Sequence, residues 1–163
     1  MQQRLLKTTF DVYTSLDEVL SEEKRLMEKA KEAMQSAHSP YSDFMVGCAV
    51  ELANGDIVLG SNQENAAYGS TICAERSALM TVGSMNRHSD VRKIAVMGTG
   101  RTFETSSPVT PCGACRQVIK EFEDLGGAPI TFLMSGAKGD IYRMVGIDSL
   151  LPFGFGPKDL NLS

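Results

Sequence analysis

The sequence predicts an α/β fold, a three-layer α-β-α sandwich built on a mixed five-stranded sheet. Apolar residues alternate in some segments and recur every three or four residues in others, which are the patterns of strands and of amphipathic helices. After an N-terminal helix, these segments follow the order strand-strand-helix-strand-helix-strand-strand, and strands interleaved with helices favour a partly parallel sheet. A chain of 163 residues fits one domain. We expect a loosely held extension over residues 1–14 and a single domain over residues 15–163.

The first predicted element is a helix that runs from about residue 15 to residue 37. Ser15 and Glu18 have the spacing of a capping box, and Ser21 is the alternative cap. Apolar residues recur along this segment at three- and four-residue steps, which gives the helix one buried stripe. The predicted stripe consists of Leu16, Val19, Leu20, Leu26, Met27, Ala30, Ala33, Met34 and Ala37.

A hairpin and then alternating helices and strands are predicted for the rest of the chain. Residues 44–52 alternate between apolar and other residues, Asn54-Gly55 is a strong turn signal, and residues 57–61 return as the second strand. Pro111 fits the first turn of a helix, where its missing N–H costs nothing. The remaining elements are a helix over 73–85, a strand within 92–99, a helix over 111–124, and strands over 130–134 and 141–145.

Three of the four cysteines lie in two short motifs. Cys112 and Cys115 have the CxxC spacing that presents two thiolates to one metal ion, and Cys73 supplies a third thiolate. Right-handed crossovers place the two cysteine-bearing helices side by side on one face of the sheet, so we expect the three thiols to meet. No other Cys or His lies near either motif. Three protein ligands with an open position are typical of catalytic zinc.

Composition limits the classes of function. The net charge is −4 and no basic block occurs, so a nucleic-acid polymer is not an expected partner. No apolar run approaches the roughly 20 residues that span a bilayer, so no membrane partner is expected. The first residues lack the apolar core of a secretory signal, and we therefore expect reduced thiols in the cytoplasm. Two disulfides in a secreted protein are the alternative use of four cysteines.

Glu75 lies two residues after Cys73 and is the candidate proton shuttle. Zinc lowers the pKa of a bound water, but three thiolates leave the site net negative and weaken the metal as a Lewis acid. Helix N-termini and the neighbouring Arg76 and Arg116 would offset that charge. The alternative readings are a carboxylate that complements a helix dipole for Glu75 and solvated surface charges for the two arginines.

Further short motifs surround the cysteines along the chain. They are Ser39-Pro40-Tyr41-Ser42, Phe44, Val46-Gly47, Asn62, Glu64-Asn65-Ala66, Tyr68-Gly69, Cys73-Ala74-Glu75, Pro111-Cys112-Gly113-Ala114-Cys115-Arg116-Gln117, Leu150-Leu151-Pro152 and Phe155-Gly156-Pro157. Together they resemble the cytidine deaminase family, in its small form with three cysteine ligands, over residues 39–160. The resemblance implies one zinc ion per subunit and hydrolytic deamination of cytidine and deoxycytidine to uridine and deoxyuridine, with release of ammonia, in pyrimidine salvage.

The resemblance also implies how a nucleoside is bound. Asn62 and Glu64 would hold the ribose hydroxyls, and a carboxylate in that place would repel a phosphate. Phe44 would pack against the pyrimidine ring, while the backbone around Ala66 and Ala74 would bond to the edge of the base.

The same resemblance implies roles around the metal and between subunits. Cys73, Cys112 and Cys115 would bind zinc, Glu75 would move protons, and Arg76 and Gln117 would tune the cysteines. The family is typically a homotetramer with shared active sites, and Tyr68 and Phe155 match positions that reach across to a neighbour.

Some positions depart from the family pattern. Gln63 replaces an apolar residue, Cys48 stands where a small residue is common, and Phe153 adds an aromatic. Three other hypotheses compete with the nucleoside deaminase: deamination of another cytosine-bearing compound such as blasticidin S, a zinc-stabilised binding module without catalysis, and a disulfide-stapled interaction domain.

Overall fold

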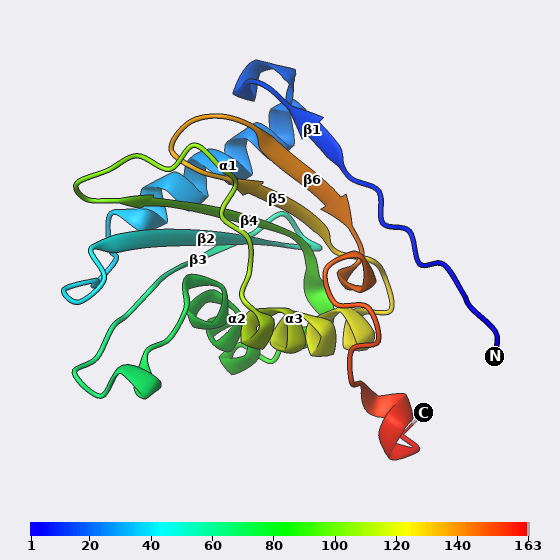
Figure 1. The fold of residues 1–163 in the computed structure, drawn as a ribbon. Coiled ribbons are helices and arrows are strands. Elements are labelled where there is room, and N and C mark those ends of the chain that lie inside the picture. Colours follow the sequence, from blue (N-terminus) through cyan, green and yellow to red (C-terminus); the bar gives the residue numbers. More distant parts are fainter. Residues whose placement is uncertain (163) are drawn as a thin grey trace.

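The protein is a mixed β-sheet covered by helices on both faces, as a computed structural model describes it for residues 1–162 (Figure 1). Helix α1 covers one face, and α2 and α3 lie side by side on the other. The predicted three-layer α-β-α sandwich is confirmed, with six strands in place of five. The elements are β1 (Asp11–Tyr13), α1 (Ser21–Met34), β2 (Phe44–Leu52), β3 (Ile57–Ser61), α2 (Ala74–Ser84), β4 (Val91–Gly100), α3 (Gly113–Gly126), β5 (Thr131–Ser135) and β6 (Ile141–Val145).

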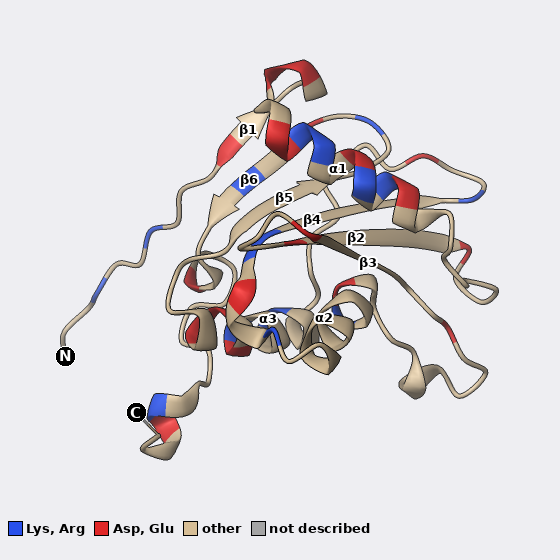
Figure 2. Ribbon diagram, turned by 180° about the vertical axis from the view of Figure 1, so that it is seen from behind, with Lys and Arg blue, Asp and Glu red and all other residues tan. Residues whose placement is uncertain are grey.

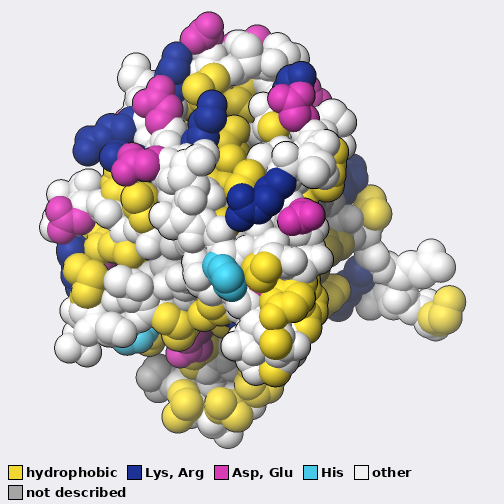
Figure 3. Space-filling model, turned by 90° about the vertical axis from the view of Figure 1, so that its left-hand side faces the viewer, with side chains coloured by type: hydrophobic (Ala, Val, Ile, Leu, Met, Phe, Trp, Pro, Cys, Tyr) yellow, Lys and Arg dark blue, Asp and Glu magenta, His cyan; other side chains and the backbone are white. Residues whose placement is uncertain are grey.

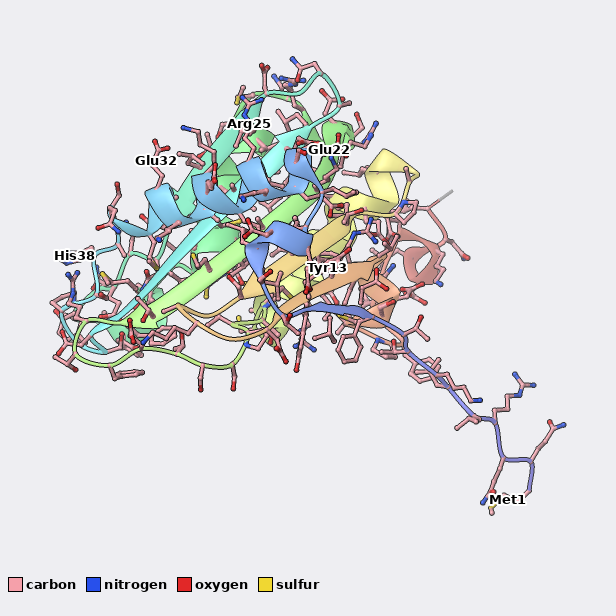
Figure 4. All side chains as sticks on the ribbon, turned by 90° about the horizontal axis from the view of Figure 1, so that it is seen from above. Met1, Tyr13, Glu22, Arg25, Glu32 and His38 are labelled. Atoms are coloured by element: carbon pink, nitrogen blue, oxygen red, sulfur yellow. The ribbon has the colours of Figure 1, made fainter. Side chains whose placement is uncertain are left out.

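The sixth strand comes from the segment that the sequence predicts to be a loose extension. Strand β1 pairs antiparallel with β6 at the edge of the sheet, where Val12 lies opposite Tyr142. The ring of Phe10 also packs on Tyr142, with ring centroids 4.8 Å apart. Residues before this contact run away from the domain as far as Met1 (Figure 4). Three residues are too few to show an alternating pattern, which is why the sequence does not reveal β1.

The predicted helix over residues 15–37 is divided in two. Leu16–Glu18 form a 3-10 turn, Leu20 is extended, and α1 begins at Ser21. The predicted capping box is wrong, because Ser15 makes no side-chain cap bond and the Glu18 carboxylate instead accepts from Thr14. The break leaves the Leu20 side chain 56% exposed, although the stripe over α1 itself is confirmed. The buried stripe residues are Val19, Leu26, Met27, Ala30, Ala33, Met34 and Ala37.

The alternation along β2 determines which side chains enter each core. Cys48 and Val50 belong to the core beneath α2 and α3, whereas Ala49 faces α1. Two glycines allow the helices to approach the sheet closely: a Cβ at Gly47 would lie 2.0 Å from the Ala30 carbonyl oxygen of α1, and a Cβ at Gly60 would lie 2.5 Å from the Ala74 carbonyl oxygen of α2. The predicted hairpin is confirmed, because β2 and β3 pair antiparallel with Val50 opposite Val58.

The centre of the sheet positions the two cysteine-bearing helices. The strand order is β1-β6-β5-β4-β2-β3, with β4 and β5 parallel and the other pairs antiparallel. Helix α2 connects β3 to β4 and α3 connects β4 to β5, so both begin at the same end of the sheet (Figure 1). Pro111 precedes the α3 cap residue rather than lying in its first turn. None of the helices described over residues 1–162 is both long enough and apolar enough to cross a bilayer.

Candidate metal centre and active site

The three predicted ligands meet at the adjoining N-termini of α2 and α3. Cys73 is the N-cap residue of α2, Cys112 is the N-cap residue of α3, and Cys115 lies in the first turn of α3. The Sγ atoms of Cys73 and Cys112 are 3.8 Å apart, and those of Cys112 and Cys115 are 3.5 Å apart. All four cysteines of the chain are free thiols. The structure therefore brings together a cluster of thiols and leaves no disulfide staple among residues 1–162.

The donor set fits a zinc ion. Zn–S bonds of about 2.3 Å in a tetrahedron place neighbouring sulfurs about 3.8 Å apart, close to the separations found here. Within residues 1–162, these three cysteines are the only group of potential ligands close enough to share a metal. A centre with three protein ligands is of the catalytic kind, because closed structural sites have four. Both helices also direct their N-terminal N–H groups toward the cluster, which stabilises thiolates.

Arg76 is the charged side chain that contacts the thiols. Its Nη2 lies 3.7 Å from Cys73 Sγ and also donates to the Thr71 carbonyl oxygen at 3.1 Å. A hydrogen bond from Cys115, and then that from Arg76, lower the pKa of Cys73 to about 5. Arg76 therefore favours the thiolate that a metal requires.

The other two residues expected beside the cysteines make different contacts. Arg116 donates to the carbonyl oxygens of Pro111 at 2.8 Å and Leu150 at 2.7 Å. Gln117 Nε2 donates to the carbonyl oxygen of Phe155 at 2.8 Å. Both side chains thus join α3 to flanking segments rather than to sulfur.

Glu75 is buried in the first turn of α2, with 4% of its surface exposed. Burial raises the pKa of its carboxyl group, and the neighbouring Cys73 adds to that shift. The same side chain lines a cavity of about 280 Å³ in front of the cysteines. A buried carboxyl group at the wall of a cavity, beside a metal centre, can accept and return a proton there.

The cavity gathers most of the predicted substrate residues. It is open on one side and is bounded by the start of β2, the loop after β3 and the two helix N-termini. Predicted residues at its wall are Phe44, Asn62, Glu64, Tyr68, Cys73, Ala74, Glu75 and Cys112. The cavity is also lined by five residues for which the sequence predicts no role: Ser42, Val46, Thr71, Val109 and Thr110.

Asn62 and Phe44 form one rigid unit at this wall. The Asn62 side chain accepts from the Val46 N–H at 2.8 Å and donates to the Phe44 carbonyl oxygen at 2.9 Å. Asn62 therefore ties the loop after β3 to the start of β2 and fixes the backbone that carries the Phe44 ring.

Glu64 is held by a network of donors. Its Oε2 accepts from the Tyr41 N–H at 2.8 Å, and its Oε1 accepts from the Ser42 hydroxyl at 2.5 Å and the Tyr68 hydroxyl at 3.3 Å. Desolvation of this carboxylate is outweighed by these hydrogen bonds, which hold the pKa of Glu64 below its ordinary value. Glu64 thus presents a fixed negative charge to the cavity. The Ser42 hydroxyl is one of these donors. Its place in the Ser39-Pro40-Tyr41-Ser42 motif is the feature of the sequence that could have indicated this contact with Glu64.

Two predicted substrate residues lie away from the cavity. Ala66 is exposed on the loop after Glu64, and the Phe155 side chain is 56% exposed on the C-terminal segment. Gln63, one of the departures from the family pattern, donates to the Ser36 carbonyl oxygen and so secures this loop to the end of α1. Cys48 is fully buried and burial raises its pKa, as expected of a core residue.

Charge around the molecule is mixed. Lysine, arginine, aspartate and glutamate alternate along the outer face of α1 (Figure 2). Figure 3 shows one side of the molecule, where acidic and basic groups are interspersed above and apolar side chains are more frequent below. On the sides that these two figures show, the charged side chains of residues 1–162 form no continuous basic track.

The cluster of three thiols and the buried acid beside it border one cavity, and this arrangement is typical of a zinc-dependent hydrolase. Comparison with known proteins specifies the class further. Residues 20–125 match the family model described as the cytidine and deoxycytidylate deaminase zinc-binding region. The chain belongs to this deaminase family, and it is a zinc-dependent hydrolytic deaminase.

Individual relatives agree with that assignment. A cytidine deaminase of Halalkalibacterium halodurans is 41% identical over 83% of this chain and 96% of its own length. One from Sporosarcina psychrophila is 40% identical over 84% of this chain and 93% of its own. The crystal structure of cytidine deaminase from Burkholderia pseudomallei is similar, with a TM-score of 0.71 and 39% identity, over 80% of this chain and 97% of that one.

Proposed function

We propose that the protein converts cytidine and deoxycytidine to uridine and deoxyuridine, with water consumed and ammonia released. The choice of nucleosides over nucleotides as substrates rests on the residues that line the cavity. Among the described residues that form its wall there is no Lys, Arg or His, and Glu64 contributes a negative charge. A phosphate would be repelled there, whereas an amide and a carboxylate suit the two hydroxyls of a sugar. The family description alone includes a nucleotide substrate as well.

Glu75 is the residue proposed to move the protons. Zinc held by Cys73, Cys112 and Cys115 would lower the pKa of a bound water and so favour its attack. The water oxygen adds to C4 of the cytosine ring, and the Glu75 carboxylate takes up the released proton. Glu75 passes this proton to N3, then takes the second proton from the new C4 hydroxyl and delivers it to the amino group, so that the C4–N bond breaks, C4=O forms and ammonia leaves. Burial of Glu75 supports this role, because it raises the pKa of the carboxyl group toward neutral pH, where a group that both accepts and donates protons works best.

The remaining residues of the cavity would bind the nucleoside. Phe44, fixed through Asn62, provides an apolar face for the pyrimidine ring. Glu64 accepts hydrogen bonds from ribose hydroxyls, and the Asn62 amide lies beside it at the same wall. The backbone of Ala74, between Cys73 and Glu75, lies at the cavity wall and is suited to bond the edge of the base.

We also propose a homotetramer with shared active sites. A cavity of about 280 Å³ is at the small end for a site that encloses a whole ligand. Tyr68 and Phe155, which would reach a neighbouring copy, are each 56% exposed. A cytoplasmic location and a role in pyrimidine salvage complete the proposal, supported by free thiols that suit a reducing compartment. Light scattering on the zinc-loaded protein tests the tetramer.

The activity is tested by an ultraviolet assay on zinc-loaded protein. Cytidine, deoxycytidine, cytosine and cytidine monophosphate are compared side by side, with blasticidin S as a further cytosine-bearing compound. Conversion of the two nucleosides, with the nucleotide much slower, is the expected result. Preference for the monophosphate would contradict the argument from the cavity lining, and inactivity on every compound would favour a zinc-stabilised binding module.

A further inference from the structure

The C-terminal segment, residues 150–156, lies directly on the helix that carries two of the metal ligands. Arg116 Nη1 donates to the Leu150 carbonyl oxygen at 2.7 Å, where the segment begins. Gln117 Nε2 donates to the Phe155 carbonyl oxygen at 2.8 Å, near its end. Both donors follow Cys115 immediately in α3. The segment is therefore tied to the first turns of the metal-binding helix at two points.

Two glycines let the segment lie close to α3. A Cβ at Gly154 would lie 2.6 Å from Lys120 Cδ, and a Cβ at Gly156 would lie 2.8 Å from Asp124 Oδ2. Lys120 and Asp124 are themselves fixed by an ion pair of 3.0 Å. The helix thus forms a firm surface, and the residues on either side of Phe155 pack against it without side chains of their own.

This packing fixes the Phe155 backbone while its ring stays in solvent. The Phe155 side chain is 56% exposed. Within residues 1–162, the Gln117 amide is the hydrogen-bond donor that ties residues 152–156 to α3. An exposed aromatic ring on an immobilised backbone is suited to insertion into a neighbouring surface, because little conformational entropy remains to be lost.

We infer that Gln117 is a positioning residue, which acts through the Phe155 carbonyl to hold the Phe155 ring in place for the active site of a second copy of the chain. The inference rests on the proposed function, in which active sites are shared. Because Cys115 and Gln117 lie on one helix, the position of the ring is set relative to the metal centre. This role differs from a direct effect of Gln117 on the thiolates.

The test replaces Gln117 by Met, which has similar length and no hydrogen-bond donor. The KM for cytidine should rise about fivefold, the equivalent of about 1 kcal/mol for one lost hydrogen bond, while kcat and zinc content stay as in the wild type. The Phe155→Ala variant should also raise KM, and adding Gln117→Met to it should have little further effect, because the two changes act through one ring. Glu121→Met, one turn along α3 and exposed, is the matched control.

A spectroscopic measurement separates positioning from general stability. The chain contains no tryptophan, so Phe155→Trp introduces a single reporter. Gln117→Met should lower the fluorescence anisotropy of this reporter in zinc-loaded protein. A fall in kcat or in zinc affinity with unchanged anisotropy would overturn the inference in favour of a direct effect on the cysteines. Unchanged KM and anisotropy would overturn it outright. Inactive wild-type protein would instead contradict the proposed function, and the anisotropy would still show whether Gln117 holds residue 155.

Discussion

Arg76 Nη2 lies 3.7 Å from the Sγ atom of Cys73 and is anchored on its other side by the Thr71 carbonyl oxygen. The guanidinium therefore stays beside a sulfur that must be negatively charged to bind a metal. Desolvation raises the pKa of Cys73, but the hydrogen bonds from Cys115, Arg76 and Cys112 outweigh it. A cation beside the cluster would also offset the negative charge of three thiolates when they hold a metal.

Arg76→Gln should weaken zinc binding about tenfold, because groups that bond to metal ligands typically contribute that much affinity. Competition with a coloured chelator measures the change. Arg25→Gln, on the exposed face of α1, is the control for the loss of one positive charge (Figure 4). Equal zinc affinity in the two variants would show that Arg76 does not stabilise the thiolates.

Glu64→Gln should make the Tm of the protein depend less on pH in the acidic range. The folded-state pKa of Glu64 is held below its ordinary value of 4.5, so ionised Glu64 stabilises the protein above that pH. This contribution is lost as the pH falls through the lower folded-state pKa. Between about pH 6 and about pH 3, the Tm of the wild type should therefore decline more steeply than that of the variant.

The matched control for that measurement is Glu121→Gln, which removes an exposed carboxylate from α3. Its Tm should decline in parallel with the wild type. If the Tm of Glu64→Gln declined with pH as steeply as the Tm of the wild type and of the control, the hydrogen bonds to Glu64 would not favour its charged form.

Gly60→Ala should loosen α2 from the sheet. The added Cβ would lie 2.5 Å from both the Ala74 carbonyl oxygen and the Ala78 backbone nitrogen, and backbone atoms cannot move aside cheaply. Overpacking of this kind costs about 1–3 kcal/mol in the free energy of unfolding, which urea denaturation measures.

Because Ala74 follows Cys73, the same variant should also bind zinc more weakly. Gly69→Ala is the control for stability, since a Cβ there would meet no atom within 4 Å. If Gly60→Ala were as stable as Gly69→Ala, the close approach of α2 to β3 would not be a constraint.

Much of the core could be predicted because its pattern is local. The alternation of residues 44–52 gives β2 with the same bounds as the structure, and the turn at Asn54-Gly55 fixes the return strand. The apolar periodicity runs through Leu20 without interruption, so the break there is indicated only by the alternative cap at Ser21, one residue from the observed N-cap of α1. Strand β1 depends on pairing with β6, a contact between distant parts of the chain that leaves no local signal.

The metal centre could be predicted because the spacing of its cysteines and the handedness of the crossovers are sufficient to bring them together. The contacts of Gln117 could not be, because they depend on where residues 150–156 lie in space. The contacts of Asn62 could not be predicted either, because its amide bonds to the Phe44 and Val46 backbone of the neighbouring strand β2. Family resemblance identifies such residues, whereas their partners emerge only from the folded chain.

The most direct measurement is the zinc content and the cytidine turnover of Glu75→Gln in one purified sample, beside the wild type. The substitution keeps the size of the side chain and removes its ability to exchange a proton at neutral pH. Zinc content should stay at the wild-type level while turnover falls about 10²- to 10⁴-fold, the range of general acid–base catalysis. Wild-type turnover in the variant would contradict the account, because the proton shuttle would then have to be another group.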